Sequence, residues 1–168
     1  GPPPATADLL TKHGVRSVTT IDSLPTPPAV LLMAVKPQVM DEVFAPLAKL
    51  AGPSTVVLSI AAGRTIASFE QFLKPGAAVV RSIPNTPAAV GRGITVAAAN
   101  AHATDAHKRT VTELLSAIGE VAWVDDEALI DPVTAVSGSG PAYVFYMVEA
   151  LAAAGVAAGL KPELAMQL

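Results

Sequence analysis

Short, unbroken apolar runs alternate with segments of helical periodicity along the first three quarters of the chain. The apolar runs have the length of strands that are buried on both faces, and they lie at residues 30–35, 55–60, 77–83, 94–99 and 120–124. Apolar residues recur every three or four positions in other segments. This spacing predicts helices at about 5–13, 38–50, 66–73 and 104–118.

The order of these elements indicates the fold class. Strands that alternate with helices at this spacing are typical of an α/β fold with a doubly wound, mostly parallel sheet. Thr104 precedes the last of these helices and is expected to be its N-cap, because its hydroxyl can accept a hydrogen bond from a free backbone N–H group.

Beyond Asp125 the strand signals cease, and the pattern to Leu168 is helical, with the breaker Ser137-Gly-Ser-Gly-Pro141 near its start. We therefore expect a sheet domain at residues 1–124 and the start of an all-helical domain at residues 125–168. The helical pattern still continues at Leu168, so this second domain is expected to be incomplete.

Composition narrows the kind of protein further. Hydrophobic residues make up 51% of the chain and aromatic residues only 4%, which indicates a core of small aliphatic side chains. The net charge is −3 and the basic residues do not cluster, so nucleic acid is a poor candidate partner. Without cysteine there is no disulfide or thiolate metal site, and the three histidines are scattered, so we predict no metal centre.

The first residues lack the basic and apolar regions of a signal peptide, and no apolar run is expected to reach the length of a membrane span. The longest apolar stretch, 142–160, contains Glu149 and is interpreted as a buried helix. A cytoplasmic protein is therefore expected.

Candidate chemistry follows the strands, because ligands of such sheets bind beyond the carboxyl ends of the strands. Lys36-Pro37-Gln38 follows the first strand, Ala61-Ala62-Gly63 the second and Pro84-Asn85-Thr86-Pro87 the third. A lysine there can contact a phosphate or ribose, and a small turn lets a flat ring approach the backbone. Each segment also has a plainer interpretation: a solvated loop lysine, a tight turn, and an Asx-turn at Asn85.

Two further segments have similarly open interpretations. The glycines of 137–141 can place a helix N-terminus against a carboxylate, or they can allow two helices or two subunits to approach closely. The acidic residues Asp125, Asp126 and Glu127 are commonly just a solvated helix start that the helix dipole favours, and Asp131 can extend that cap.

Four segments together resemble the pyrroline-5-carboxylate reductase family in order and spacing: Ala34-Val-Lys-Pro-Gln38, Ser59-Ile-Ala-Ala-Gly63, Arg81-Ser-Ile-Pro-Asn-Thr-Pro87 and Asp131-Pro-Val-Thr-Ala-Val-Ser-Gly-Ser-Gly-Pro-Ala-Tyr-Val-Phe145. The resemblance covers essentially the whole chain. It implies a Rossmann-type domain followed by a helical domain through which subunits dimerise, often into larger rings. It also implies reduction of 1-pyrroline-5-carboxylate to L-proline, with NADPH as the usual cofactor and NADH as the other candidate.

The resemblance also implies roles for single residues. Val35, Lys36, Pro37 and Gln38 are expected along the ribose and pyrophosphate of the cofactor, Ile60, Ala61 and Ala62 beside the nicotinamide, and Asn85 at the same cofactor site. Glu127, Ser137 and Gly138 are expected to contact the substrate. A carboxylate such as Glu127 favours the protonated imine, which is the better electrophile. No catalytic residue is assigned.

One departure from the family pattern keeps other functions open. The family begins with a strand and a G-x-G-x-x-G-type turn; no such turn is present, and Gly91-Arg-Gly93 lies too late, so the first βα unit is expected to be absent. The alternatives are a related nicotinamide enzyme, of the β-hydroxyacid or deazaflavin-linked type, and a non-catalytic α/β module for oligomerisation. The Ser-Gly-Ser-Gly-Pro-Ala-Tyr run at 137–143 favours the reductase.

Overall fold

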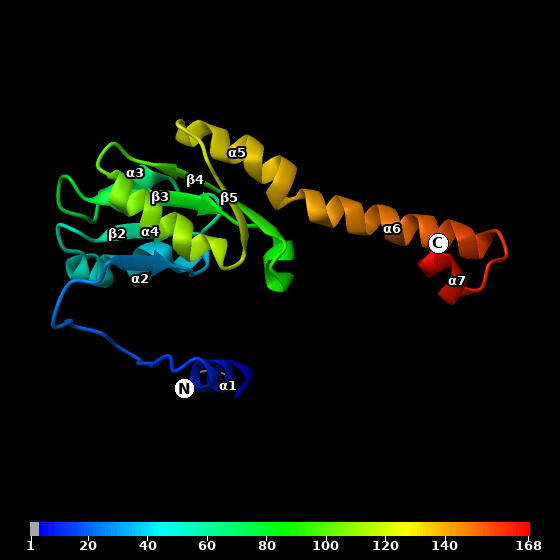
Figure 1. Cartoon of the computed structure of the whole chain (residues 1–168), viewed down its shortest axis with the longest axis horizontal. Helices are drawn as coiled ribbons and strands as arrows, with labels where there is room; N and C mark the ends of the chain where they lie inside the picture. The colour runs from blue at the N-terminus through cyan, green and yellow to red at the C-terminus, as the bar shows by residue number, and fades with distance from the viewer. Residues whose placement is uncertain (1–3) are drawn as a thin grey trace.

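Five strands form one sheet in the order in which they occur along the chain (Figure 1). The structure is a computed structural model and describes residues 4–168. The strands are β1 (Val30–Met33), β2 (Val56–Ser59), β3 (Ala78–Ile83), β4 (Gly93–Ala99) and β5 (Gly119–Trp123). All five lie where the apolar runs predict them.

The sheet is parallel except between β3 and β4. The pairs β1–β2, β2–β3 and β4–β5 are parallel, whereas β3 and β4 pair antiparallel, with Ile83 opposite Val96. A short 3₁₀ segment, Thr86–Val90, connects β3 to β4. It is too short for the crossover that a parallel pair needs, so β4 must run back along β3. The prediction of a mostly parallel sheet is confirmed, with this one exception.

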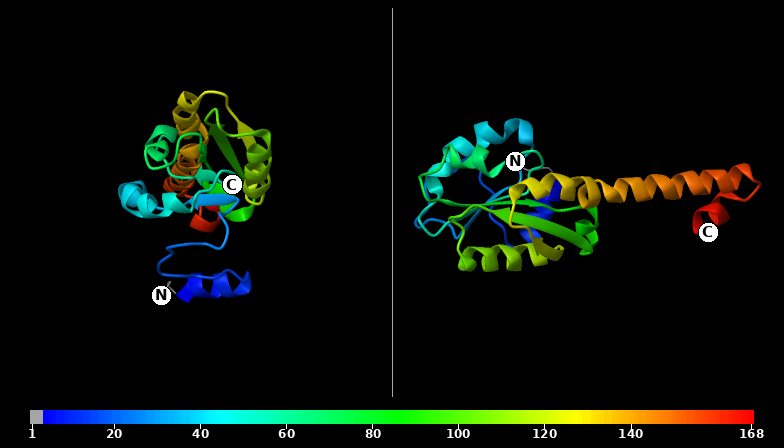
Figure 2. Two further views of the ribbon diagram at one scale, coloured as in Figure 1. Left: turned by 90° about the vertical axis from the view of Figure 1, so that its left-hand side faces the viewer. Right: turned by 90° about the horizontal axis from the view of Figure 1, so that it is seen from above.

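Helices cover both faces of the sheet, as Figure 2 shows from above. α2 (Met40–Leu47), flanked by the 3₁₀ turns Pro37–Val39 and Ala48–Leu50, and α3 (Ile66–Glu70) pack on one face. α4 (Asp105–Ser116) packs on the other, with Thr104 as its N-cap, as predicted. The helix α1 (Pro4–Lys12) is also present where expected, and it lies apart from the sheet (Figure 1).

The alternation of side chains along the strands divides the core into layers. Val57 and Val79 face α2 and α3, where Phe44 and Phe69 are fully buried and meet edge to face at 5.1 Å. Val56, Leu58 and Val80 face Val111 and Leu115 of α4. A third cluster joins Ile83, Val96 and Ala98 to Ile130, at the beginning of the helical segment.

One continuous helix leads out of the sheet domain. It comprises a 3₁₀ turn (Glu127–Leu129), α5 (Ile130–Val133), a π-helical turn (Thr134–Gly138) and α6 (Gly140–Ala157), and α7 (Pro162–Gln167) follows it. The prediction that 137–141 breaks the helix is wrong. The chain passes Gly138, Gly140 and Pro141 through the wider π turn, in which the Ser139 N–H donates to the Thr134 carbonyl at 2.8 Å, so helical bonding continues.

α6 extends away from the sheet (Figure 1), and most of its large apolar side chains are exposed. Tyr143, Phe145, Tyr146 and Leu151 are each at least 60% exposed. α7 covers only a small part of it, where Ala152 and Ala165 are buried. Residues 4–168 of this chain therefore do not provide the predicted burial of this helix.

The uninterrupted helix also corrects the expectation that no apolar run is long enough for a membrane span. The helix Glu127–Ala157 is long and apolar enough to cross a membrane, and only 6% of its 18-residue apolar segment is buried. Core helices of water-soluble proteins can have the same length and composition.

Candidate functional site

The carboxyl ends of β1, β2 and β3 lie at one edge of the sheet. Met33 pairs with Ser59, and Ser59 pairs with Arg81, so the three parallel strands end nearly in line. The structure therefore brings together the turns that begin near Lys36, Ala61 and Asn85. This edge is where doubly wound sheets bind their ligands.

The turn after β1 contains an exposed cation, Lys36. Val35 packs against the cluster around Phe44, whereas Lys36 is exposed and its side chain makes no capping bond. Pro37 begins the 3₁₀ turn that leads into α2, and Gln38 is exposed. Both polar side chains of this turn are thus available to a ligand.

In the turn after β2, the exposed residues have little or no side chain, so a ligand can approach the backbone closely. The Ile60 N–H donates to the Met33 carbonyl, which continues the pairing with β1, and the buried Ala61 donates its N–H to Ser59 Oγ at 3.2 Å. Ala62 is exposed, and Gly63 has φ of 70°, a conformation that glycine adopts without strain. The exposed part of this turn therefore has no side chain larger than a methyl group.

Asn85 connects the two ends of the turn between β3 and β4. Its Oδ1 accepts a hydrogen bond from the Ile94 N–H at 3.0 Å, and its carbonyl accepts one from the Ala88 N–H. The Asx-turn interpretation is wrong, because the side chain bonds nine residues ahead instead of two. A role of Asn85 at the cofactor stays a prediction.

A buried arginine joins the sheet to the helical segment. Arg81 is 4% exposed; its Nη1 lies 3.2 Å from Glu127 Oε1, and its Nη2 lies 2.9 Å from Asp131 Oδ1. We call Arg81, Glu127 and Asp131 the Arg81 clasp. Sequence reasoning missed it, although a charged residue within the apolar run 77–83 was a visible signal, since a buried arginine needs an acidic partner.

Glu127 also contacts α3. Its Oε1 accepts a hydrogen bond from the Ile66 N–H at 2.8 Å, which satisfies a donor of the first turn of α3. Neither contact uses Oε2, and no hydrogen bond from residues 4–168 to this atom is found. Asp126 fits the predicted solvated helix start, because its Oδ1 accepts the Ala128 N–H. Glu127 does not, because its side chain is only 28% exposed and is bound to Arg81. Asp131 is 78% exposed and also pairs with Arg81.

Ser137 and Gly138 lie in the π turn, away from Glu127. Ser137 Oγ donates to the Val133 carbonyl at 3.2 Å, and a Cβ at Gly138 would lie 3.3 Å from Thr134 Cγ2. Ten residues separate Ser137 from Glu127, which is about 15 Å along a helix axis. The structure therefore does not bring the three predicted substrate residues together within one chain.

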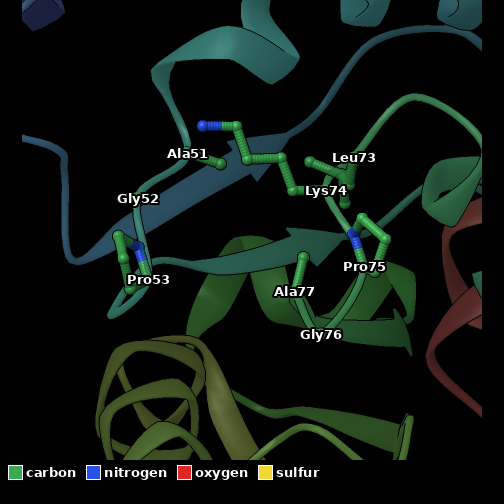
Figure 3. Close-up of a pocket in the computed structure, with 8 residues that line it drawn as sticks. All are labelled: Ala51, Gly52, Pro53, Leu73, Lys74, Pro75, Gly76 and Ala77. Atoms are coloured by element: carbon green, nitrogen blue, oxygen red, sulfur yellow. The ribbon is translucent and has the colours of Figure 1, made fainter.

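A hollow also lies away from the edge formed by the carboxyl ends of β1, β2 and β3 (Figure 3). A cavity of about 250 Å³ is lined by residues 51–53 and 73–77, where Lys74 reaches towards Ala51. Both segments precede strands, so the cavity is at the amino ends of β2 and β3 and not at the predicted edge. Among residues 4–168, no group of His, Asp or Glu side chains suited to a metal ion is found.

Comparison with known proteins adds to this geometry. A family model described as pyrroline-5-carboxylate reductase dimerisation matches residues 127–168. The pyrroline-5-carboxylate reductase of Pseudomonas aeruginosa is 46% identical over 139 residues, which are 83% of this chain and 51% of that protein. The chain thus spans about half the length of this curated relative.

Solved structures show the same similarity. A pyrroline-5-carboxylate reductase from Coxiella burnetii superposes with a TM-score of 0.87 at 32% identity, over 96% of this chain and 60% of the other. A Plasmodium falciparum pyrroline carboxylate reductase with NADP bound superposes with a TM-score of 0.76 at 31% identity, over 83% of this chain and 52% of the other.

Proposed function

The chain belongs to the pyrroline-5-carboxylate reductase family, and from this premise we propose that the protein reduces 1-pyrroline-5-carboxylate to L-proline with NADPH. One structural observation supports this proposal. The family-like turns after β1, β2 and β3 lie at one edge of the sheet, where such sheets bind ligands. The relative from Plasmodium falciparum, with NADP bound, supports the choice of cofactor; NADH is the second candidate.

The turns fit a nicotinamide cofactor. Lys36 is an exposed cation that can contact a ribose or phosphate oxygen, with Val35, Pro37 and Gln38 beside it. The turn of Ile60, Ala61 and Ala62 allows a flat ring close to the backbone, because Ala62 is exposed and small. The cofactor supplies the hydride, and this chain supplies the surface that holds and orients the cofactor.

Glu127 is the proposed contact for the imine nitrogen. Its carboxylate is fixed by Arg81 and the Ile66 N–H through Oε1, while Oε2 faces no donor among residues 4–168. A fixed negative charge favours the iminium over the neutral imine, and the iminium accepts hydride more readily. Ser137 and Gly138 are too far along the helix to share so small a substrate with Glu127 of the same chain. We therefore assign their proposed contact to a second copy.

The helical segment supports a homo-oligomer. An exposed helix whose side chains are apolar apart from Glu149 and the tyrosine hydroxyls needs a partner surface, and the matching family model describes dimerisation. We propose that residues 1–124 form the dinucleotide-binding domain, that residues 125–168 belong to the dimerisation and substrate domain, and that the protein is cytoplasmic.

The test is a substrate comparison in the whole protein. Oxidation of NADPH, followed by its absorbance, is expected with 1-pyrroline-5-carboxylate and not with 2-hydroxy or 3-hydroxy acids and NADP. Turnover of a hydroxy acid alone would favour the β-hydroxyacid dehydrogenase alternative. Oligomers without turnover of either substrate would favour the non-catalytic module.

A further inference from the structure

Three elements that the proposed reaction must keep aligned meet at Arg81. The residue itself lies on β3. Its guanidinium binds Glu127 and Asp131 on the helical segment, and Glu127 in turn binds the backbone of Ile66 at the start of α3. The sheet, the cofactor side and the substrate side are therefore joined through one side chain.

An arginine is suited to this position for physical reasons. Burial of a cation is costly unless acidic groups and hydrogen bonds compensate it. The planar guanidinium offers two terminal nitrogens in a fixed fork, and here each reaches a different carboxylate. A lysine has the same charge but a single terminal nitrogen, so it does not reproduce that fixed fork.

On the helix, the clasp fixes orientation. Glu127 and Asp131 are four residues apart, which places them on one face of the helical segment. Ile130, between them, is fully buried against Ile83, Val96 and Ala98. Two ion pairs and one apolar anchor thus hold the beginning of this helix against the strand ends.

On the sheet side, the clasp fixes the distance between the Glu127 carboxylate and the start of α3. α3 begins at Ile66, directly after the turn that contains Ala61 and Ala62. Glu127 Oε1 lies 2.8 Å from the Ile66 nitrogen and 3.2 Å from Arg81 Nη1. The carboxylate proposed to meet the imine is therefore tied to the turn proposed to hold the nicotinamide.

We infer that Arg81 is a positioning residue: through Glu127, it holds the substrate side of the site in register with the cofactor turn. This inference rests on the proposed function. Arg81 acts through Glu127 and needs no contact with either ligand. Its loss leaves the binding groups present but misaligned, and alignment affects the chemical step more than it affects binding.

The test uses Arg81→Lys and Arg81→Met in the whole protein, with Lys49→Met as control. Lys49 makes an ion pair with Asp22 in solvent, far from the clasp in the sequence, so its loss should leave kcat unchanged. Arg81→Lys should lower kcat about 10- to 100-fold, with both KM values changed less than about threefold. Arg81→Met should lower it further. The primary isotope effect on kcat with 4-deuterated NADPH should rise in Arg81→Lys, because hydride transfer becomes rate-limiting.

Two results would overturn the inference. One is a lysine variant with wild-type kcat and isotope effect. The other is a variant with a lower melting temperature whose kcat per folded enzyme is unchanged, which would make the clasp purely structural.

A second readout needs no turnover, so the two proposals can fail separately. Hydrogen exchange at the Ile66 amide should accelerate at least about tenfold in Arg81→Lys relative to Lys49→Met, because Glu127 is no longer held against it. Unchanged exchange would refute the positioning of Glu127 even in an active enzyme. Faster exchange in a protein that reduces no imine would instead support the clasp and refute the proposed reaction.

Discussion

Arg64, in the turn between β2 and α3, forms an ion pair with Asp41 in the first turn of α2. The pair bridges the two segments that follow β1 and β2, which are those proposed to hold the cofactor. Arg64 is largely buried and Asp41 is half exposed. The pair therefore ties the turn after β2 to α2, the helix that follows the turn of Lys36.

We predict that Arg64→Met weakens NADPH binding modestly. Loss of a partly exposed pair is typically worth about 0.2 to 1 kcal/mol, or up to about fivefold in Kd. Titration of NADPH fluorescence measures the effect, and Asp41→Asn should produce the same change. If the double variant shows the sum of both losses, the pair is not the cause, because coupled residues are non-additive.

Lys36→Ala should raise the cofactor KM and leave the KM for 1-pyrroline-5-carboxylate nearly unchanged, because Lys36 is an exposed cation at the edge proposed to hold the cofactor. Steady-state kinetics with each substrate varied in turn provide the measurement. Lys49→Ala removes the same charge near the other end of α2 and serves as the matched control. An equal rise in both KM values would argue against a specific cofactor contact.

Glu127 variants separate its two contacts. Glu127→Gln keeps an oxygen that can accept the Ile66 N–H but loses the charge, whereas Glu127→Ala loses both. We expect the alanine variant to lose about 1 to 3 kcal/mol of unfolding free energy. Both variants should lower kcat/KM for the imine, at unchanged NADPH affinity. A glutamine variant as active as the wild type would show that attraction to the iminium is not its role.

The exposed helix should determine the oligomeric state. Tyr146 and Leu151 are 74% and 66% exposed, and a charge at either position is incompatible with an apolar interface. Tyr146→Glu and Leu151→Glu are expected to give monomers in light scattering. Leu114→Glu, on α4, replaces a 43% exposed leucine of the sheet domain and should leave the assembly intact. A wild-type protein that is already monomeric would contradict the prediction.

Asn100 should matter for stability and not for activity. Its Oδ1 accepts the Val79 N–H and its Nδ2 donates to the Ala77 carbonyl, which fastens the beginning of β3 to the end of β4. Asn100→Ala leaves these backbone groups without partners and should cost about 1 to 3 kcal/mol of unfolding free energy. Denaturant unfolding tests this, with both KM values as the control.

The sequence predicted the elements better than the contacts between them. Continuous apolar runs and helical spacing located every strand and the major helices, because burial of such segments is a local property of the chain. The antiparallel direction of β4 could also have been inferred from the sequence, because no helix that could connect parallel strands is predicted between residues 83 and 94. The π turn could not have been inferred, because glycine and proline at 137–141 are equally compatible with a break in the helix.

The site was predicted in the same uneven way. The turns after the strands were found because their position follows from the topology. The roles of Arg81 and Arg64 were not, since each depends on a carboxylate far away in the sequence: Asp131 lies 50 residues beyond Arg81, and Asp41 lies 23 residues before Arg64. Pairing over such separations depends on how the helices pack, which periodicity does not show.

The π turn has a mechanical consequence. The helix is clamped to the sheet on one side of this turn, and about 27 Å of α6 extends beyond it, at 1.5 Å per residue. Such a helix is a lever arm: a rotation of roughly 10° at residues 134–138 would move its far end by about 5 Å. In an assembly built on α6, the backbone conformation of these five residues would thus affect the separation of the sheet domains.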